Sequence, residues 1–480
     1  MDPVTLAKEK GAAVLGLGVS GIAAAEFLLS RGVASPLLCD KNPEKASDPA
    51  VAALVARGAR TRFGENRLPE LPDGLLVRSP GVRPDRSELA EKKRAGALVC
   101  GEVGLFLAYS PARLFAVTGS AGKSTVTTLV ASIFRAAGLD AFAGGNLGAS
   151  LLPTLPYLTE KSVAVLELSS FQLMDLSPEP ERAALLNVTE NHLNWHTGME
   201  EYRAAKERIF GRNTVGVFPA SDPSLRRLAA GREARLFSTA PPAPDERKAG
   251  EVWYAPDGGW VSRFSDEGVF RLFPIERLRL PGKHNLLNLL AAVAMTDGIT
   301  PIEAMEEAVS RFTGIPHRME EVPGPAGVRC VDSSIDTTPE RTLATLSALF
   351  PARPILLLGG AEKGLPYLPL AEPLARRVKD AILFGKAARA IAEALDAGGI
   401  PYRVIPAFDD AVRAALSRAE PGDTVLLSPA CTSYDAFHDF AARGDRFSAL
   451  CREARKEKEK NKEKNVPREA SAERKKDDEI

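Results

Sequence analysis

LFAVTGSAGKST, at Leu114–Thr125, joins a short apolar strand to a glycine-bearing loop, and the helical pattern TVTTLVASIFRAAG begins at its last residue. Small loop residues let backbone N–H groups close around phosphate oxygens, while Lys123 adds a positive charge and Ser124 or Thr125 can ligate Mg²⁺. The longer form of this loop needs a glycine where the chain has Val117, so only the shorter form from Gly119 is present. The order strand, loop, helix predicts binding of a nucleoside triphosphate.

Length and composition narrow the class of protein. A chain of 480 residues exceeds one ordinary hydrophobic core, so about two to four domains are expected. A formal net charge of zero argues against a dedicated nucleic-acid or membrane-surface binder. The five cysteines are scattered without a CxxC pair, which indicates reduced thiols in a cytoplasmic protein. Gly11–Ser30 is interpreted as strand, turn and helix, not as a signal peptide or membrane span, because Glu26 and four glycines interrupt it.

Alternating apolar runs and amphipathic segments predict an α/β fold with three domains and a tail. Residues 1–107 and 314–453 are expected to be Rossmann-like, and 108–313 to be a P-loop ATPase-type domain with a mostly parallel sheet. The glycine-rich stretch 250–280 is expected to form a smaller antiparallel insert. Residues 454–480 are almost wholly charged, so they are expected to stay disordered or to form a fraying charged helix. The clearest expected strands lie in AAVLGLG, PLLCD, GLLVRS, RLFAVTG, VAVLELS, AALLNVT, PILLLGG, DAILFG and DTVLLSPA.

Polar residues follow two neighbouring apolar strands. Glu167 ends VAVLE, and His192 follows AALLNVTEN. A buried carboxylate needs a cation or a hydrogen-bond donor, so Glu167 is either in a structural ion pair or a Mg²⁺ ligand facing the phosphate loop. His192 and His196 lack the glutamate of HExxH, which argues against a zinc protease.

Lys206 shares one face of a predicted helix with Tyr202 and Ile209. Its ammonium either reaches solvent from the rim or enters a site, where burial favours the neutral amine. A neutral amine can react with CO₂ to form a carbamate, which would turn a cation into a metal-binding anion.

Gly16-Leu-Gly18-Val-Ser-Gly21 follows a strand, and Asp40 follows a second strand. This is the dinucleotide-fold pattern, with an acid placed for a ribose. It is compatible with NAD or with any diphosphate-bearing nucleotide. A chain with both this loop and an ATP loop suggests an enzyme that joins a nucleotide-linked substrate to something else.

The order of TGSAGKST, LELSSFQL, NVTENHLNWH, YRAAKERI, LPGKHNLLNLLAA, GIPHRME, LLLGGAEKG and SPACTSYDAFHDF resembles the Mur ligases. The similarity is greatest to members that add D-glutamate to UDP-N-acetylmuramoyl-L-alanine during peptidoglycan precursor synthesis. It implies that ATP converts a carboxylate into an acyl phosphate, which the amine of D-glutamate attacks. It also implies a cytoplasmic protein, expected to be a monomer without nucleic-acid binding or membrane insertion.

The resemblance assigns roles to individual residues. Lys123, Glu167, His192 and Lys206 are expected to be catalytic; Ser124 and Glu167 would hold one Mg²⁺, and His192 and carbamylated Lys206 a second. The expected ATP contacts are Gly119, Ser120, Ala121, Gly122, Lys123, Ser124, Thr125, Asn285 and Arg318. The expected contacts to the nucleotide-linked substrate are Gly18, Val19, Ser20, Asp40, Ser79, Gly81, Asn146, Ser169, Ser170 and Gln172. Those to D-glutamate are Thr337, Lys363, Ser433 and Phe440.

The stretch Asp332-Ser-Ser-Ile-Asp-Thr-Thr-Pro339 departs from the family's usual NDSKATNP. Ser333 stands for the usual aspartate and Ile335 for the usual lysine, so a charge pair near the amino-acid site is lost. Three alternatives stay open: a Mur-type ligase that adds another amino acid, an NAD(P)-dependent oxidoreductase, and a non-catalytic nucleotide-binding regulator. The oxidoreductase would leave the phosphate loop and Lys206 without a role.

Overall fold

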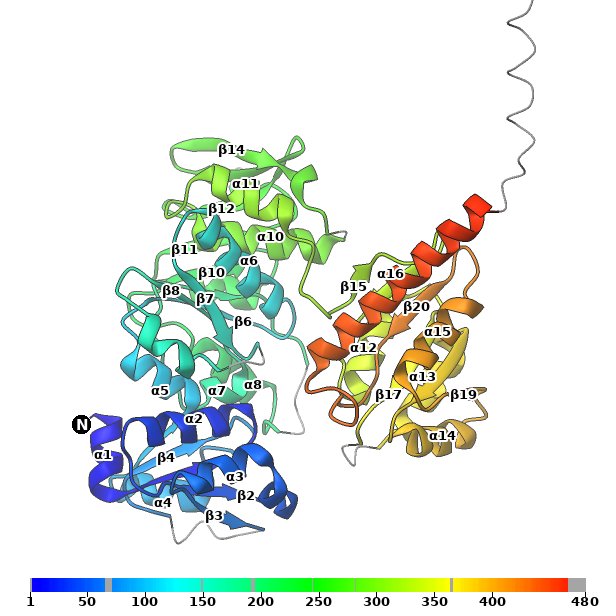
Figure 1. The fold of residues 1–480 in the computed structure, drawn as a ribbon. Coiled ribbons are helices and arrows are strands. Elements are labelled where there is room, and N and C mark those ends of the chain that lie inside the picture. The colour runs from blue at the N-terminus through cyan, green and yellow to red at the C-terminus, as the bar shows by residue number, and fades with distance from the viewer. Residues whose placement is uncertain are drawn as a thin grey trace, which may run out of the picture. The chain divides into compact units, whose positions relative to one another are not determined.

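Three separate sheets covered by helices organise the computed structural model, which describes residues 2–64, 71–147, 150–190, 195–243, 245–280, 282–362 and 366–464 (Figure 1). The chain divides into two compact units, one ending at Phe312 and the other beginning at Thr313. The first unit holds two of the sheets and the second unit holds the third. The α/β fold with three domains is therefore confirmed, while the exact domain boundaries stay a prediction.

The first sheet is fully parallel, in the order β3-β2-β1-β4-β5. Its strands are β1 (Ala12–Leu15), β2 (Leu37–Asp40), β3 (Arg60–Phe63), β4 (Leu75–Arg78) and β5 (Leu98–Gly101). Its helices are α1 (Pro3–Lys10), α2 (Val19–Ser30), α3 (Pro49–Ala56), α4 (Ser87–Arg94) and α5 (Glu102–Tyr109). A Cβ on Gly21 would lie 1.9 Å from the Gly16 carbonyl oxygen, so only glycine lets α2 pack this closely on the turn after β1.

The second sheet has the order β14-β13-β12-β11-β10-β9-β6-β8-β7. Its strands are β6 (Arg113–Thr118), β7 (Ala141–Gly145), β8 (Val163–Glu167), β9 (Arg182–Leu185), β10 (Val215–Pro219), β11 (Ala234–Phe237), β12 (Val252–Asp257), β13 (Trp260–Ser265) and β14 (Gly268–Pro274). Pairing is parallel from β7 to β12, whereas β12, β13 and β14 pair antiparallel, which confirms the expected insert.

Helix α6 (Lys123–Ala136) packs against both α10 (Lys283–Thr296) and α11 (Ile302–Arg311). The other helices of this domain are α7 (Ser170–Leu173), α8 (Met199–Glu207) and α9 (Pro223–Arg226). At the carboxyl end of α10, the buried guanidinium of Arg182 donates to the carbonyl oxygens of Ala294, Met295 and Asp297 at 3.3, 3.1 and 2.8 Å. Arg182 thus satisfies carbonyls that the helix itself leaves without partners.

The second unit has a six-stranded sheet in the order β15-β16-β20-β17-β18-β19, parallel except for β15. Its strands are β15 (Glu320–Val322), β16 (Arg329–Asp332), β17 (Ile355–Gly359), β18 (Asp380–Phe384), β19 (Arg403–Val404) and β20 (Thr424–Leu427). Its helices are α12 (Pro339–Leu349), α13 (Ala371–Arg377), α14 (Ala388–Ala397), α15 (Phe408–Arg418) and α16 (Phe440–Lys464).

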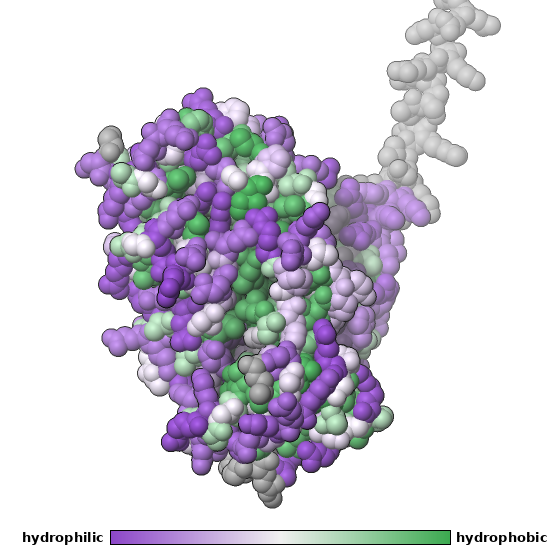
Figure 2. Space-filling view, turned by 90° about the vertical axis from the view of Figure 1, so that its left-hand side faces the viewer, coloured by the Kyte–Doolittle hydropathy of each residue, from purple (hydrophilic) through white to green (hydrophobic). Residues whose placement is uncertain are grey.

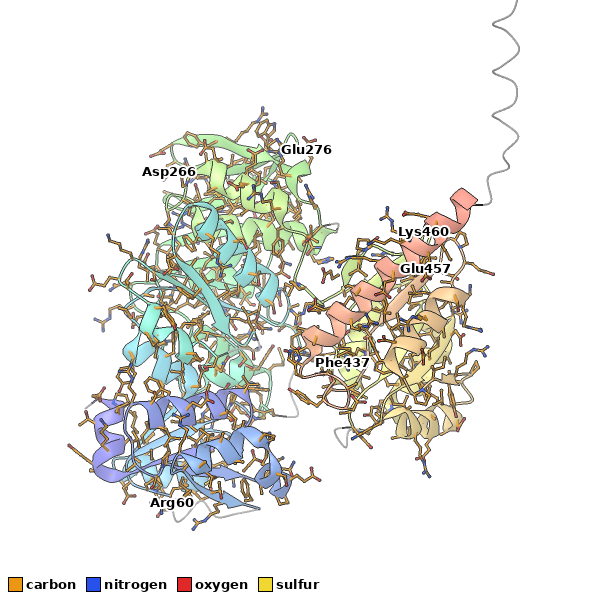
Figure 3. All side chains as sticks on the ribbon, viewed as in Figure 1. Arg60, Asp266, Glu276, Phe437, Glu457 and Lys460 are labelled. Carbon is orange, nitrogen blue, oxygen red and sulfur yellow. The ribbon has the colours of Figure 1, made fainter. Side chains whose placement is uncertain are left out.

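Helix α16 buries Phe447, Leu450 and Cys451 near its start and then runs on as a charged, exposed helix. Glu457 and Lys460 lie on this exposed part (Figure 3). The helix therefore enters the predicted tail and continues to Lys464.

Hydrophilic residues cover most of the face in Figure 2, with apolar residues between them. In the part of the chain that the structure describes, no helix combines the length and apolar character needed to cross a membrane. The five cysteines are free thiols, as expected.

Candidate active site

The phosphate loop lies between β6 and α6, at the carboxyl ends of three adjacent parallel strands. β6 has β8 on one side and β9 on the other, with Val117 opposite Glu167. Gly122 precedes α6 with a left-handed backbone (φ 82°), and a Cβ there would lie 2.4 Å from Asn288 Oδ1 of α10. Glycine is therefore required both by the turn and by the approach of α10.

Side chains that the sequence analysis did not single out hold this loop. The amide of Asn187, two residues after β9, accepts from Ala121 N at 2.8 Å and donates to Ala121 O at 3.1 Å. Ser120 Oγ lies 2.8 Å from the hydroxyl of Tyr202 on α8 and accepts from Thr189 N at 3.0 Å. The loop's shape is thus fixed by β9 and α8 as well as by its own glycines.

Two lysines meet at one carbonyl of the loop. Lys123 Nζ donates to Gly119 O at 2.9 Å and to Ser120 O at 3.1 Å, and Lys206 Nζ donates to Gly119 O at 2.8 Å. The structure therefore brings Lys206, from a helix more than eighty residues away, to the predicted phosphate loop. Ser124, in the first turn of α6, is buried beside them.

Lys206 is only 2 % exposed, and its ammonium lies 4.6 Å from the centre of the Tyr202 ring. Burial, together with the charge of Lys123, lowers the pKa of Lys206 to about 7, although the carboxylate of Glu167 acts in the opposite direction. A large fraction of neutral amine at neutral pH follows, which is the condition for reaction with CO₂.

Glu167 ends β8 and is 2 % exposed. Its Oε1 accepts from Asn146 Nδ2 at 2.9 Å, whereas its buried Oε2 has no hydrogen-bond partner among the residues that the structure describes. An unpartnered buried carboxylate oxygen is costly unless a cation compensates it. A carboxylate oxygen is the type of donor that Mg²⁺ prefers, and ligation of Mg²⁺ by Glu167 and Ser124 stays a prediction.

The segment after β8 contains three predicted substrate contacts, Ser169, Ser170 and Gln172, and each of them makes hydrogen bonds within the protein. Ser169 and Gln172 form a capping box at the start of α7, in which Ser169 Oγ accepts from Gln172 N and Gln172 Oε1 accepts from Ser169 N. Ser170 is buried, and its hydroxyl lies 2.9 Å from His196 Nε2. Asn146 contacts Glu167 through its backbone as well as its side chain.

The dinucleotide-type loop of the first domain is held by the residues predicted to bind the nucleotide. Asp40 Oδ2 accepts from Leu17 N at 2.7 Å, and Ser79 Oγ donates to Gly16 O at 2.7 Å. Gly18 caps α2, and Val19 next to it is 58 % exposed despite its apolar side chain. Ser20 lies in the first turn of α2, and Gly81 lies in the turn after β4.

In the second unit, the segment that departs from the family pattern satisfies its own polar groups. Asp332 is fully buried, with Oδ2 2.8 Å from His317 Nδ1. This hydrogen bond raises the pKa of His317. Asp336 Oδ2 accepts from Thr345 Oγ1 at 2.7 Å and from Ser428 Oγ at 2.8 Å.

The predicted D-glutamate contacts Thr337, Ser433 and Phe440 lie on this unit, as does the predicted ATP contact Arg318, while Asn285 lies in the first turn of α10. Ser433 is buried, and Phe440 begins α16, where its carbonyl accepts from Ser334 Oγ at 2.7 Å. His192 and Lys363 lie outside the described residues.

Comparison with known proteins places this geometry in a family. Family models described as Mur ligase MurD-like N-terminal domain, Mur ligase middle domain and Mur ligase glutamate ligase domain match residues 10–101, 117–296 and 317–431. A UDP-N-acetylmuramoylalanine--D-glutamate ligase of Symbiobacterium thermophilum is 40 % identical over 451 residues, 92 % of this chain and 98 % of that protein. The chain belongs to the Mur ligase family.

Two further Mur ligases, one compared by sequence and one by structure, are also similar to this chain. A UDP-N-acetylmuramoylalanine--D-glutamate ligase of Chromohalobacter salexigens is 37 % identical over 90 % of this chain and 95 % of its own. Among solved structures, the UDP-N-acetylmuramate-alanine ligase MurC of Thermotoga maritima is similar with a TM-score of 0.51 and 18 % identity, covering 92 % of this chain and 99 % of that one. The structural similarity supports the fold.

Proposed function

We propose that this Mur ligase uses ATP to join D-glutamate to UDP-N-acetylmuramoyl-L-alanine, in the synthesis of peptidoglycan precursors. The observation that carries the proposal is the 40 % identity over nearly the whole of a relative with that name. The grouping of Lys123, Glu167 and Lys206 around one phosphate loop supports it. The cytoplasmic location and the monomeric state expected from the sequence belong to the same proposal.

The chemistry begins with the carboxylate of the nucleotide-linked alanine, which is a poor electrophile until one of its oxygens carries phosphate. Transfer of the terminal phosphoryl group of ATP gives an acyl phosphate. The neutral amine of D-glutamate attacks its carbonyl carbon, and the tetrahedral intermediate loses one proton from its nitrogen and expels phosphate to leave an amide. Lys123 stabilises the phosphoryl oxygens, and the loop N–H groups orient them.

The site fits Mg²⁺, because the unpartnered Glu167 Oε2 and the Ser124 hydroxyl are oxygen donors beside the loop. When bound, Mg²⁺ would neutralise phosphate charge. Glu167 and Ser124 would hold one ion, and His192 and Lys206 a second. We further propose that Lys206 acts as a carbamate, formed when its neutral amine adds to CO₂ and releases one proton.

The decisive experiment measures phosphate release by the purified protein with UDP-N-acetylmuramoyl-L-alanine, ATP and Mg²⁺. Release is expected with D-glutamate and not with L-glutamate or L-lysine. Release with another amino acid in place of D-glutamate would contradict the substrate assignment. Carbamylation is tested separately by ¹³C NMR with labelled bicarbonate, where a carbamate signal is expected in wild type and not in Lys206→Met.

A further inference from the structure

A chain of hydrogen bonds connects the first domain to the segment after β8. Arg83 Nη2 donates to Glu201 Oε1 at 2.8 Å, and Glu201 Oε2 lies 3.0 Å from His196 Nδ1. The opposite ring nitrogen of His196, Nε2, lies 2.9 Å from Ser170 Oγ. Four side chains from three separate segments are thus joined end to end.

Physical chemistry fixes the direction of each bond. Hydrogen bonds from Arg83, ahead of smaller contributions from Thr197 N and His196, lower the pKa of Glu201 to about 2, so its carboxylate only accepts. Burial lowers the pKa of His196, which favours a neutral ring. Nδ1–H therefore donates to Glu201, Nε2 accepts, and the hydroxyl of Ser170 donates to Nε2.

Two members of this chain are close in sequence to residues of the proposed active site. Ser170 comes three residues after Glu167, and Glu201 precedes Lys206 by five residues on α8. Arg83 follows the turn Ser79–Gly81, whose Gly81 carbonyl accepts from Trp195 Nε1 at 3.3 Å. The guanidinium of Arg83 also lies 4.8 Å from the centre of the Trp195 ring.

A second arginine secures the other end of the same turn. Arg78 is 1 % exposed; its Nη2 donates to Phe171 O of α7 at 2.8 Å, and its Nε donates to Asp175 at 2.7 Å. The turn Ser79–Gly81 is therefore attached to the middle domain on both sides.

We propose that His196 is a positioning residue, which holds the substrate-binding turn of the first domain in register with the strand end that carries Glu167. The proposal rests on the proposed function, because the turn is assigned to the nucleotide-linked substrate. Asn187 holds the phosphate loop through two hydrogen bonds to Ala121, whereas Tyr202, whose hydroxyl contacts Ser120, has its ring centre 5.2 Å from that of His196. A break at His196 therefore affects the nucleotide-linked substrate more than ATP.

Two substitutions break the chain at different bonds. In His196→Asn the amide takes the place of Nδ1 and keeps the contact to Glu201, whereas in His196→Gln it takes the place of Nε2 and keeps the contact to Ser170. Both variants are expected to raise the KM for UDP-N-acetylmuramoyl-L-alanine about tenfold, as the loss of one charge-assisted or buried hydrogen bond does. The KM for ATP should rise less, by about twofold at most, since the two hydrogen bonds from Asn187 to Ala121 still hold its loop. His438→Gln, at a histidine whose side chain is 82 % exposed, is the matched control and should change neither constant.

A double variant tests whether Arg83 and His196 act through the same chain of hydrogen bonds. The KM for UDP-N-acetylmuramoyl-L-alanine is measured for the double variant and for each single variant. Arg83→Lys combined with His196→Gln should raise this KM by less than the product of the two single effects, because both interrupt one chain, although Arg83 also contacts Trp195. The inference is overturned if the KM for ATP rises as much as the KM for UDP-N-acetylmuramoyl-L-alanine, or if neither KM rises. It is also overturned if the effect of the double variant equals the product of the two single effects. Should the histidine variants not fold, Glu201→Gln carries the test with the same expected rise, and an unchanged KM there overturns the inference. Wild-type turnover with D-glutamate is measured first, so that failure of the proposed function is seen separately.

Discussion

The ends of β8 and β16 each carry a buried carboxylate, but the two are satisfied in different ways. Glu167 after β8 leaves Oε2 without a partner among the described residues, beside two lysines and a glycine-bearing loop. Asp332 at the end of β16 has His317 on one oxygen and Ser334 N on the other. Asp336, four residues later, is likewise bonded to two hydroxyls.

This difference separates a carboxylate oxygen that is available to a cation from two carboxylates that already accept hydrogen bonds within the protein. A buried carboxylate oxygen without a partner costs stability, and a bound cation would return that stability. In the segment after β16, the usual aspartate and lysine of the family are Ser333 and Ile335, and Asp332 and Asp336 accept hydrogen bonds within the protein. Substitutions at β8 and its loop should therefore change catalysis, and those at β16 should change mainly stability.

The largest expected effect is that of Lys123→Met at the phosphate loop. Removal of a charge aimed at transferring phosphate should lower kcat by roughly three orders of magnitude, as the loss of one transition-state donor does. Steady-state phosphate release measures it, with Lys161→Met, at an exposed lysine, as the control. A decrease of less than about tenfold would remove Lys123 from the chemistry.

The next largest effect is expected from Lys206→Met, on the way the free energy of unfolding depends on pH. Its pKa is about 7 in the folded protein and 10.5 ordinarily, so between these values the unfolded chain binds more protons. Wild type should therefore gain stability over Lys206→Met as pH rises from 7 to 10, by at most ~1.4 kcal/mol per pH unit. Urea denaturation in CO₂-depleted buffer measures the difference. A difference that is flat with pH would contradict the buried, neutral lysine.

Asn187→Ala should have a smaller effect on catalysis. It removes two hydrogen bonds to Ala121, which are together worth about 1–3 kcal/mol, so kcat/KM for ATP should fall roughly tenfold to a hundredfold. Asn213→Ala, at an exposed asparagine, is the control. An unchanged kcat/KM would show that the glycines alone shape the loop.

The smallest effect is expected at β16, from Asp332→Asn. The pKa of His317 is raised by Asp332, so the pair stabilises the folded state below the ordinary histidine pKa, and this stability is lost as pH rises through the higher folded value. Relative to wild type, the variant should lose about 1 kcal/mol more of its free energy of unfolding at pH 5.5 than at pH 9, as measured by urea denaturation. Equal losses at both pH values would mean that the pair does not depend on the histidine charge.

The sequence predicted the parts of the fold that depend on contiguous residues. Apolar runs such as RLFAVTG and PILLLGG became β6 and β17, because a strand buried on both faces is apolar throughout. The edge strands β3 (RTRF) and β19 were missed, since they are short and polar or exposed and depend on a neighbour for pairing.

The site followed the same rule. The loop Gly119–Thr125 is one stretch of chain and was predicted whole, and Lys206 was singled out because a lysine broke a helical face. Asn187 and Tyr202 were missed because what distinguishes them is a contact with residues more than sixty positions away. His196 was considered only as a metal ligand, and its two hydrogen bonds depend on the way α7 and α8 meet.

Arg182 at the start of β9 has a consequence for nucleotide affinity, although it lies away from the loop. Its guanidinium donates hydrogen bonds to the last carbonyl oxygens of α10, including that of Met295. About 10 Å of helix separate Met295 from Asn288, whose side chain lies next to Gly122. Helix α10 is therefore held by Arg182 at its carboxyl end and lies against the phosphate loop at Asn288, in its first half. We expect a change in the packing around Arg182 to shift α10 and with it Asn288. Residues remote from the nucleotide would in this way alter the affinity for it.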